Sequence, residues 1–308
     1  MNKTAYITHP VCLKHDNGTG HPESPDRLRA IDKQLRDSDL YQRLQYFESP
    51  KVKREELERI HDAKYLDFIE ENAPKSEKEI FYLDADTRLS YYSLEAAQRA
   101  AGSVVQATDL VMQKKVDNAF CAVRPPGHHA KAGSAMGFCI YNNIIAGIAH
   151  ALEHYGLERV ALLDFDVHHG NGSENIIGND ERILFCSTFQ HPFYPGEPFA
   201  NNTNVICTPL SAGASGTEFR QIVKDKWLLA LEQFKPQMIF ISAGFDAHTD
   251  DFLANLNFTE ADYQWVTEQI VDIANQYSQG RIVSTLEGGY NTSALASSVE
   301  VHLRSLMR

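Results

Sequence analysis

Residues 159–172 read RVALLDFDVHHGNG, a short apolar run followed at once by acidic and histidine side chains. The run is apolar throughout rather than alternating, which is typical of a parallel strand that is buried on both faces. Ligands of open parallel sheets bind outside the carboxyl ends of the strands, and the polar cluster of this segment falls there. The segment therefore predicts both the fold class and the place of a functional site.

Runs of the same kind recur along the chain and alternate with helical patterns. The other strand-like runs lie near 4–8 (TAYIT), 118–123 (NAFCAV), 182–187 (RILFCS), 237–243 (QMIFISA) and 281–286 (RIVSTL). The helical stretches lie near 53–72, 92–114, 139–155, 214–234, 259–278 and 292–307. Strands that alternate with helices indicate βαβ crossovers. We therefore predict an α/β fold, a single domain over residues 1–308, with a central, mostly parallel sheet and helices on both faces.

The composition is that of an ordinary globular protein. Of 308 residues, 43% are hydrophobic and 23% charged, and 29 Lys and Arg face 41 Asp and Glu, a net charge of −12. This balance argues against nucleic-acid binding, where a basic face supplies most of the affinity. No stretch approaches the roughly 18 apolar residues of a membrane span, and the five cysteines form no C-x-x-C pair. We expect a soluble, cytoplasmic protein in a reducing compartment, with neither nucleic acid nor a membrane as partner.

Four of the strand-like runs lead into loops rich in histidine, carboxylate or tyrosine. These loops are 124–129 (RPPGHH), 164–172 (DFDVHHGNG), 243–248 (AGFDAH) and 287–290 (EGGY). Because the carboxyl ends of parallel strands meet at one edge of a sheet, we expect the four loops to form one rim.

Asp166, His168 and Asp246 form a set of two carboxylates and one imidazole. Asp164, Asp166 and His168 are spaced by two, so on an extended segment they point the same way. Three protein ligands with an open position are the arrangement of a catalytic divalent metal, with Zn²⁺ the first choice and Fe²⁺ also suitable. The alternative is a pair of satisfied carboxylates in a structural network. We favour the metal site because Asp is rarely buried without a partner.

The loops also carry candidates for acid–base chemistry. His128 and His129 follow a strand end and the rigid PPG segment, which favours a general acid/base pair over two unrelated loop histidines. Tyr290 follows two glycines, which let the backbone approach a ligand closely. Such a tyrosine can donate a hydrogen bond to a developing oxyanion, although alone it is more often an ordinary surface aromatic.

At these residues the sequence resembles the histone deacetylase family. The matching segments are 20–28 (GHPESPDRL), 124–129, 137–143 (GFCIYNN), 164–172, 243–248 and 287–290. They keep their family order and cover nearly the whole chain. The resemblance implies a single arginase-like α/β domain around an eight-stranded parallel sheet.

The resemblance also implies two metal sites. Asp166, His168 and Asp246 would hold zinc, which lowers the pKa of a bound water and polarises the substrate carbonyl. A monovalent cation, usually K⁺, would lie near Asp164, Asp166, His168, Ser187 and Thr188, held mostly by backbone oxygens.

For catalysis, the resemblance implies that His129 is the main general base and later protonates the leaving amine. His128 would be its electrostatic companion, and Tyr290 would bind the tetrahedral oxyanion. The groups expected behind the active site are Asp164, as partner of His128, together with Asn171 and Arg27. The groups expected to contact substrate are Gly137, Phe138 and Tyr194, the last two as walls of an acyl-lysine tunnel, with Leu253, Gly288 and Asp86.

The expected substrate is an acetylated or otherwise acylated lysine. Two residues depart from patterns found in parts of the family. Asn171 stands where class I enzymes carry a second histidine-pairing Asp, and Asn there is the class II pattern. A neutral partner should raise the basicity of His129 less than a carboxylate would. Leu253 stands where polyamine-preferring members carry a glutamate, and Leu cannot pair with a cationic amine. Acetylpolyamines are therefore less favoured, but they and other small acylated amines remain the alternative substrates.

Two other classes of protein remain as alternatives to a lysine deacetylase. A ureohydrolase such as arginase shares the fold but needs two bridged manganese ions, and Gly170 and His248 stand at positions where its motifs require acidic ligands. A catalytically weak module that only binds acyl-lysine would have lost Tyr290, a histidine or a metal ligand, and none is lost. The sequence therefore predicts an active zinc-dependent lysine deacetylase.

Overall fold

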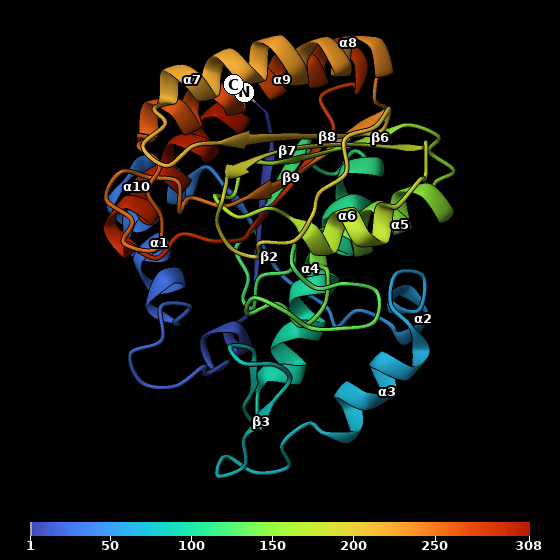
Figure 1. The fold of residues 1–308 in the computed structure, drawn as a ribbon, viewed down its shortest axis with the longest axis vertical. Helices are drawn as coiled ribbons and strands as arrows, with labels where there is room; N and C mark the ends of the chain where they lie inside the picture. The colour runs from blue at the N-terminus through green and yellow to red at the C-terminus, as the bar shows by residue number, and fades with distance from the viewer. Residues whose placement is uncertain (1) are drawn as a thin grey trace.

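The computed structural model describes residues 2–308 and contains an eight-stranded sheet with strand order β2-β1-β5-β10-β9-β6-β7-β8 (Figure 1). All its neighbouring strands are parallel, which confirms the predicted sheet. The strands are β1 (Thr4–Thr8), β2 (Gln45–Glu48), β5 (Asn118–Cys121), β6 (Val160–Asp164), β7 (Ile183–Gln190), β8 (Val205–Leu210), β9 (Met238–Ala243) and β10 (Ile282–Leu286). A separate antiparallel pair consists of β3 (Phe81–Tyr82) and β4 (Arg88–Leu89).

The two edge strands of the large sheet, β2 and β8, were not predicted from the sequence. β2 is exposed at three of its four residues, so it lacks the apolar run of a buried strand. β8 contains Pro209, which is exposed and has no backbone N–H to donate. Proline is tolerated at a sheet edge because one side of the strand needs no partner. The six inner strands were predictable because they are buried on both faces and therefore carry apolar runs.

Helices cover both faces of the sheet, as expected (Figure 1). One face carries α1 (Asp26–Asp37), α7 (Gly216–Ile222), α8 (Leu229–Phe234), α9 (Glu260–Tyr277) and α10 (Thr292–Leu306). The other carries α4 (Ser93–Met112), α5 (Asn143–Glu153) and α6 (Asn171–Ile177). Short helical turns are η1 (Pro10–Leu13), η2 (Asp39–Gln42) and the π-helical η3 (Val223–Leu228), which joins α7 to α8.

The helix predicted over 53–72 is divided into α2 (Arg54–Leu57) and α3 (Ala63–Glu71). The interruption lets His61 and Asp62 bond to the loop that follows β5. His61 Nδ1 lies 2.9 Å from the Lys131 carbonyl oxygen, and the Asp62 N–H donates to the Ala132 carbonyl at 2.8 Å. The break therefore ties this peripheral segment to the loop that carries the two catalytic histidine candidates.

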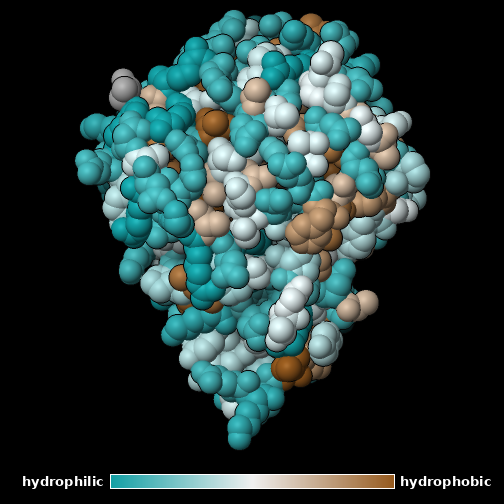
Figure 2. Space-filling view, turned by 90° about the vertical axis from the view of Figure 1, so that its left-hand side faces the viewer, coloured by the Kyte–Doolittle hydropathy of each residue, from teal (hydrophilic) through white to brown (hydrophobic). Residues whose placement is uncertain are grey.

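The surface agrees with the acidic, globular composition. Figure 2 shows a face on which hydrophilic residues predominate and hydrophobic ones occur in small groups. Within residues 2–308, every helix is too short or too polar to cross a bilayer. All five cysteines are free and buried, as their apolar sequence surroundings indicate.

Candidate active site

The four motif-bearing loops follow β5, β6, β9 and β10, which are consecutive in the middle of the sheet. Because these strands are parallel, their carboxyl ends lie at the same edge. The structure accordingly brings together the residues that the sequence singled out for chemistry. They are His128 and His129 after β5, Asp166 and His168 after β6, Asp246 after β9 and Tyr290 after β10.

Asp166, His168 and Asp246 form a compact cluster with the chemistry of a metal site. One ligand atom from each residue lies within 4.8 Å of the other two. His168 Nδ1 lies 3.0 Å from Asp166 Oδ1 and 3.2 Å from Asp246 Oδ2. Asp246 Oδ2 is buried and has no hydrogen-bond partner among residues 2–308. Two buried carboxylates, one with an unsatisfied oxygen, call for a cation, so the residues fit a divalent metal.

Two glycines allow the two carboxylates to approach each other. The Gly288 N–H donates to Asp166 Oδ2 at 2.8 Å, and a Cβ on Gly288 would lie only 2.0 Å from Asp246 Oδ2. A Cβ on Gly244 would lie 2.0 Å from Asp166 Oδ2. Gly288, which the resemblance predicts to contact substrate, packs against the candidate metal ligands in the structure. The absence of a side chain there is needed for the cluster itself.

The two histidines lie side by side, with ring centroids 4.0 Å apart, but differ in their partners. His128 Nδ1 lies 3.0 Å from Asp164 Oδ2, whereas His129 Nδ1 lies 2.7 Å from the neutral Asn171 Oδ1. Burial lowers the pKa of His128, but the charges of Asp166 and Asp164 outweigh it and raise the pKa to about 10.

The pKa of His129 changes in the opposite direction. Burial, and then the positive charges of His128 and His168, lower the pKa of His129 well below its ordinary value. At neutral pH one imidazole is therefore cationic and the other neutral. A neutral imidazole is the form that can act as a general base.

Tyr290 is held in place from two sides. Its N–H donates to Asp251 Oδ2 at 2.6 Å, and the Arg27 guanidinium lies 5.0 Å from the centre of its ring. Arg27 Nε also donates to the Gly289 carbonyl at 2.6 Å, which places the arginine against the loop that carries Tyr290. Burial raises the pKa of Tyr290 well above its ordinary value, so its hydroxyl stays protonated and can donate a hydrogen bond.

Glu287 is a buried residue of the site to which the sequence analysis assigned no role. Its Oε2 accepts hydrogen bonds from the Gly127 N–H at 2.7 Å and the His128 N–H at 3.1 Å. Its Oε1 accepts from the Ser242 hydroxyl at 3.1 Å. Burial raises the pKa of Glu287 to about 7. A carboxylate at the end of a buried strand was the available signal, and its two backbone N–H partners lie about 160 residues away in the chain.

Aromatic side chains surround the imidazoles. A Cβ on Gly137 would lie 2.5 Å from His129 Cδ2 and 3.0 Å from the Tyr194 hydroxyl, so this glycine opens the space between them. The Tyr194 ring lies 5.2 Å from His129 in an edge-on contact, and Phe138 lies 6.2 Å from Tyr290.

Phe193, next to Tyr194 in the chain, was missed. Its ring stacks on His168 at 5.4 Å and 16°. The sequence does not show which of two neighbouring aromatic residues in a loop faces a site. In the structure both Phe193 and Tyr194 lie beside the candidate site residues, on His168 and His129 respectively.

Asp86 and Leu253 lie further out. The Thr87 hydroxyl accepts from the Phe138 N–H at 3.1 Å and donates to Asp86 Oδ1 at 3.2 Å, so Asp86 is linked to the aromatic wall. Burial and the charge of Asp84 raise the pKa of Asp86 to about 6. The Leu253 N–H donates to Asp251 Oδ1 at 3.0 Å, and the leucine side chain is half-exposed.

The residues expected to hold K⁺ also lie together. Asp164 is paired across β6 and β7 with Ser187, which precedes Thr188. The hydroxyl oxygens of Ser187 and Thr188 are buried without hydrogen-bond partners among residues 2–308. Unsatisfied neutral oxygens beside a buried carboxylate are compatible with a hard cation of low charge.

Asn171 is held in turn by a carboxylate that the sequence analysis did not identify. Its Nδ2 donates to Glu197 Oε2 at 2.9 Å, and Glu197 Oε1 accepts from Lys131 Nζ at 2.6 Å. An amide that donates to Glu197 must turn its oxygen toward His129. This arrangement keeps the proton on His129 Nδ1 and leaves Nε2 as the basic atom.

Removing the Asn171 amide should therefore weaken catalysis without weakening substrate binding. We expect Asn171→Leu to lower kcat by roughly tenfold or more, the usual effect of losing a group that orients a site residue, with KM little changed. Glu197→Gln should lower kcat less, because glutamine can still accept from Asn171. Lys131→Met is the matched control and should change kcat less than about twofold. An unchanged kcat in Asn171→Leu would exclude this orienting role.

Comparisons with known proteins agree with the geometry. Residues 21–306 match the histone deacetylase domain. The chain is 34% identical to the histone deacetylase-like amidohydrolase of Pseudomonas aeruginosa, over 94% of this chain and 82% of that protein. It is 33% identical to type-2 histone deacetylase 2 of Dictyostelium discoideum over 99% of this chain, but spans only 21% of that longer protein. The crystal structure of the HDA15 HD domain superposes with a TM-score of 0.91 at 30% identity, covering 100% of this chain and 90% of that one.

The parallel sheet and the polar cluster at its strand ends thus define a hydrolase with an arginase-like α/β fold. The chain belongs to the histone deacetylase family.

Proposed function

We propose that this protein is a zinc-dependent hydrolase that removes acetyl or other acyl groups from lysine side chains. The observation that carries the proposal is the buried Asp166, His168 and Asp246 cluster, with an unsatisfied carboxylate oxygen, beside one neutral and one cationic imidazole. This combination supports hydrolysis of an amide by an activated water. Family membership supports the same class of reaction.

The three cluster residues would hold Zn²⁺, and Fe²⁺ also suits this ligand set. Once bound, the ion supplies a Lewis acid for the substrate carbonyl and lowers the pKa of a water molecule. His129, neutral and oriented by Asn171, accepts the proton of the attacking water at Nε2 and then donates it to the leaving amine. A protonated His128 beside Asp164 would stabilise negative charge that develops on the substrate carbonyl oxygen.

Tyr290 and the aromatic wall position the substrate. The Tyr290 hydroxyl donates a hydrogen bond to the tetrahedral oxyanion. Phe138, Phe193 and Tyr194 provide apolar surfaces along which an acylated alkyl chain can lie. We assign K⁺ to the site of Asp164, Ser187 and Thr188, where it would stabilise the loop that carries the zinc ligands.

Small acylated polyamines are the second candidate substrates. Asp84 and Asp86 place two carboxylates close to the aromatic wall, where they could pair with a cationic amine or accept backbone N–H groups of a peptide. The uncharged Leu253 favours the peptide. The rates of hydrolysis of an acetyl-lysine peptide and of an acetylated polyamine must therefore be compared directly.

The test is kcat/KM of zinc-loaded protein on an acetyl-lysine peptide and on acetylated polyamines, before and after treatment with a chelator. We expect the peptide to be preferred at least tenfold, with activity lost on chelation and recovered when zinc is added. A preference for the polyamine would transfer the assignment to that substrate. Activity that survives complete removal of metal would overturn the metal-dependent mechanism. No activity on either substrate, or on longer acyl chains, would favour an acyl-lysine binding module.

A further inference from the structure

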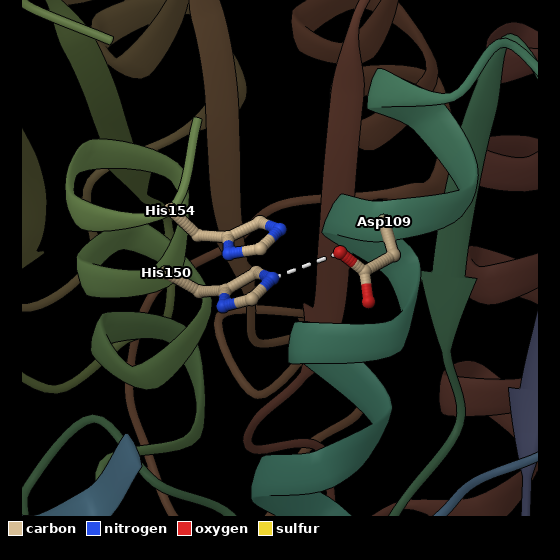
Figure 3. A group of neighbouring side chains, drawn as sticks. All are labelled: Asp109, His150 and His154. Carbon is tan, nitrogen blue, oxygen red and sulfur yellow. Dashed lines mark hydrogen bonds and ion pairs between the residues drawn. The ribbon is translucent and has the colours of Figure 1, made fainter. Parts of the chain in front are cut away.

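Asp109, His150 and His154 form a second cluster of metal-ligating side chains, on the helical layer that carries α4 and α5 (Figure 3). Asp109 lies on α4, His150 lies on α5, and His154 lies one turn later at the C-terminal end of α5. Residues four apart on a helix share one face, and both imidazoles point toward the Asp109 carboxylate. One ligand atom from each residue lies within 4.8 Å of the other two.

We propose that this cluster binds a divalent transition-metal ion such as Zn²⁺, held by the Asp109 carboxylate and both imidazoles. Imidazole and carboxylate ligands suit Zn²⁺, Ni²⁺ and Cu²⁺, whereas Mg²⁺ and Ca²⁺ take oxygen ligands. The ion would link α4 to α5. This site is separate from the active site and does not depend on the proposed deacetylase activity.

The positions of the ligand atoms require little rearrangement. His150 Nε2 lies 2.8 Å from Asp109 Oδ1. Two ligands of a tetrahedral Zn²⁺ ion, each about 2.1 Å from it, lie about 3.4 Å apart, so the two atoms would have to separate by only about 0.6 Å. The His154 ring stacks on His150 with centroids 4.8 Å apart and planes at 8°. The His154 side chain is exposed and its ring makes no hydrogen bond within residues 2–308, so it can rotate toward the ion at little cost.

Neighbouring groups support the ligands as outer partners do in metal sites. The Tyr155 hydroxyl donates to Asp109 Oδ1 at 2.7 Å and in turn accepts from Gln113 Nε2 at 3.2 Å, which orients the carboxylate. His150 is buried, and its Nδ1 has no hydrogen-bond partner among residues 2–308. Moving the ring proton from Nε2 to Nδ1, as binding of an ion at Nε2 requires, therefore breaks no hydrogen bond at Nδ1.

The nearby charges oppose a bound cation only weakly. The three side chains are among those that line a surface hollow of about 320 Å³, to which Lys51, Lys53 and Arg59 also contribute. Lys51 lies 3.3 Å from a Glu95 carboxylate oxygen, and Lys53 lies 3.6 Å from one of Glu55. Both lysine charges are thus already compensated, and the exposed His154 leaves the ion accessible to water for its remaining ligands.

Another His- and carboxylate-containing cluster, formed by His169, Glu174 and Cys207, does not share these properties. Its imidazole and carboxylate lie as close as those of the α4–α5 cluster, with His169 Nε2 2.8 Å from Glu174 Oε2, but its third ligand differs: Cys207 is buried, and its thiol donates to the same Glu174 oxygen at 3.4 Å. Burial raises the pKa of the Cys207 thiol, which opposes the deprotonation that metal binding requires. The α4–α5 cluster is therefore the stronger candidate, because its third ligand is free and exposed.

The proposal is tested by equilibrium dialysis of tag-free protein against a series of free Zn²⁺ concentrations, with bound zinc measured by elemental mass spectrometry. Wild type should bind one more zinc ion per chain than His154→Ala or Asp109→Asn. Either substitution should weaken binding at this site at least tenfold. The difference of one ion should persist in an Asp246→Asn background, so failure of the active-site assignment would not be mistaken for failure of this one.

His191→Ala is the matched control, because His191 is an exposed histidine outside the cluster. It should bind as much zinc as wild type. Addition of zinc should also raise the unfolding temperature of the wild type by more than it raises that of His154→Ala, since a ligand that binds only the folded state stabilises that state. Equal zinc content in wild type, His154→Ala and Asp109→Asn would overturn the proposal, and so would equal loss in His191→Ala.

Discussion

Asp246→Asn is expected to abolish zinc binding at the active site and hydrolytic activity together, with kcat/KM lower by about 10³-fold or more. A catalytic metal contributes several kcal/mol to the stabilisation of the transition state, and each 1.4 kcal/mol is about tenfold in rate. The metal-free variant should nevertheless unfold at the same temperature as metal-free wild type, or at a higher one.

The reason for this combination lies in the packing of Asp246. Its Oδ1 accepts from the Val167 N–H at 3.0 Å, which an amide oxygen can also do. Its Oδ2 is buried without a hydrogen-bond partner in the part of the chain that the structure describes, close to the Asp166 carboxylate. A neutral amide removes the burial of a charge and its repulsion by Asp166, which together raise the pKa of Asp246 to about 6 and so outweigh the 3.2 Å ion pair with His168 that the substitution also removes. Bound zinc, kcat/KM and thermal unfolding in chelator provide the three measurements.

Asp272→Asn changes an exposed carboxylate on α9 in the same way and should leave all three quantities as in the wild type. Wild-type activity in zinc-loaded Asp246→Asn would show that Asp246 is not a ligand. A clear fall in the unfolding temperature of the metal-free variant would contradict the inference that the two carboxylates repel each other.

Tyr290→Phe is expected to lower kcat by about two orders of magnitude or more, with a much smaller change in KM. Loss of one oxyanion donor has an effect of about this size in other hydrolases. The ring should keep its place, because Asp251 holds the backbone N–H and Arg27 lies against the ring face. Phenylalanine retains both contacts. Steady-state kinetics on the acetyl-lysine peptide measure the effect.

Tyr263→Phe is the matched control for the loss of a phenol. The Tyr263 hydroxyl is also buried and has no hydrogen-bond partner among residues 2–308, but it lies on α9 in the core. Removal of this hydroxyl should change kcat less than about threefold, since it alters the core packing of α9 and no group that contacts the substrate. A Tyr290→Phe variant with nearly unchanged kcat would remove Tyr290 from the mechanism.

The sequence could predict the fold because its inner strands carry unambiguous local signals. Runs such as 160–163 (VALL) are apolar throughout, a pattern typical of strands that are covered on both faces. The edge strands β2 and β8 have one unpaired side, so exposed residues and Pro209 are allowed and the pattern disappears. The break between α2 and α3 was equally invisible, because it depends on contacts of His61 with the distant loop that follows β5.

The sequence by itself determined the chemistry of the site. Parallel pairing brings strand ends together, so polar residues after β5, β6, β9 and β10 had to meet once the strand order placed these four side by side. Only the tertiary structure decided how those groups are paired. It places Glu287 against Gly127 and stacks Phe193 on His168. It also orients the Asn171 amide by a hydrogen bond to Glu197. It also brings Asp109 to His150 across α4 and α5. These contacts join segments far apart in the chain, and the direction of a side chain across such a distance is set by packing, which no local pattern encodes.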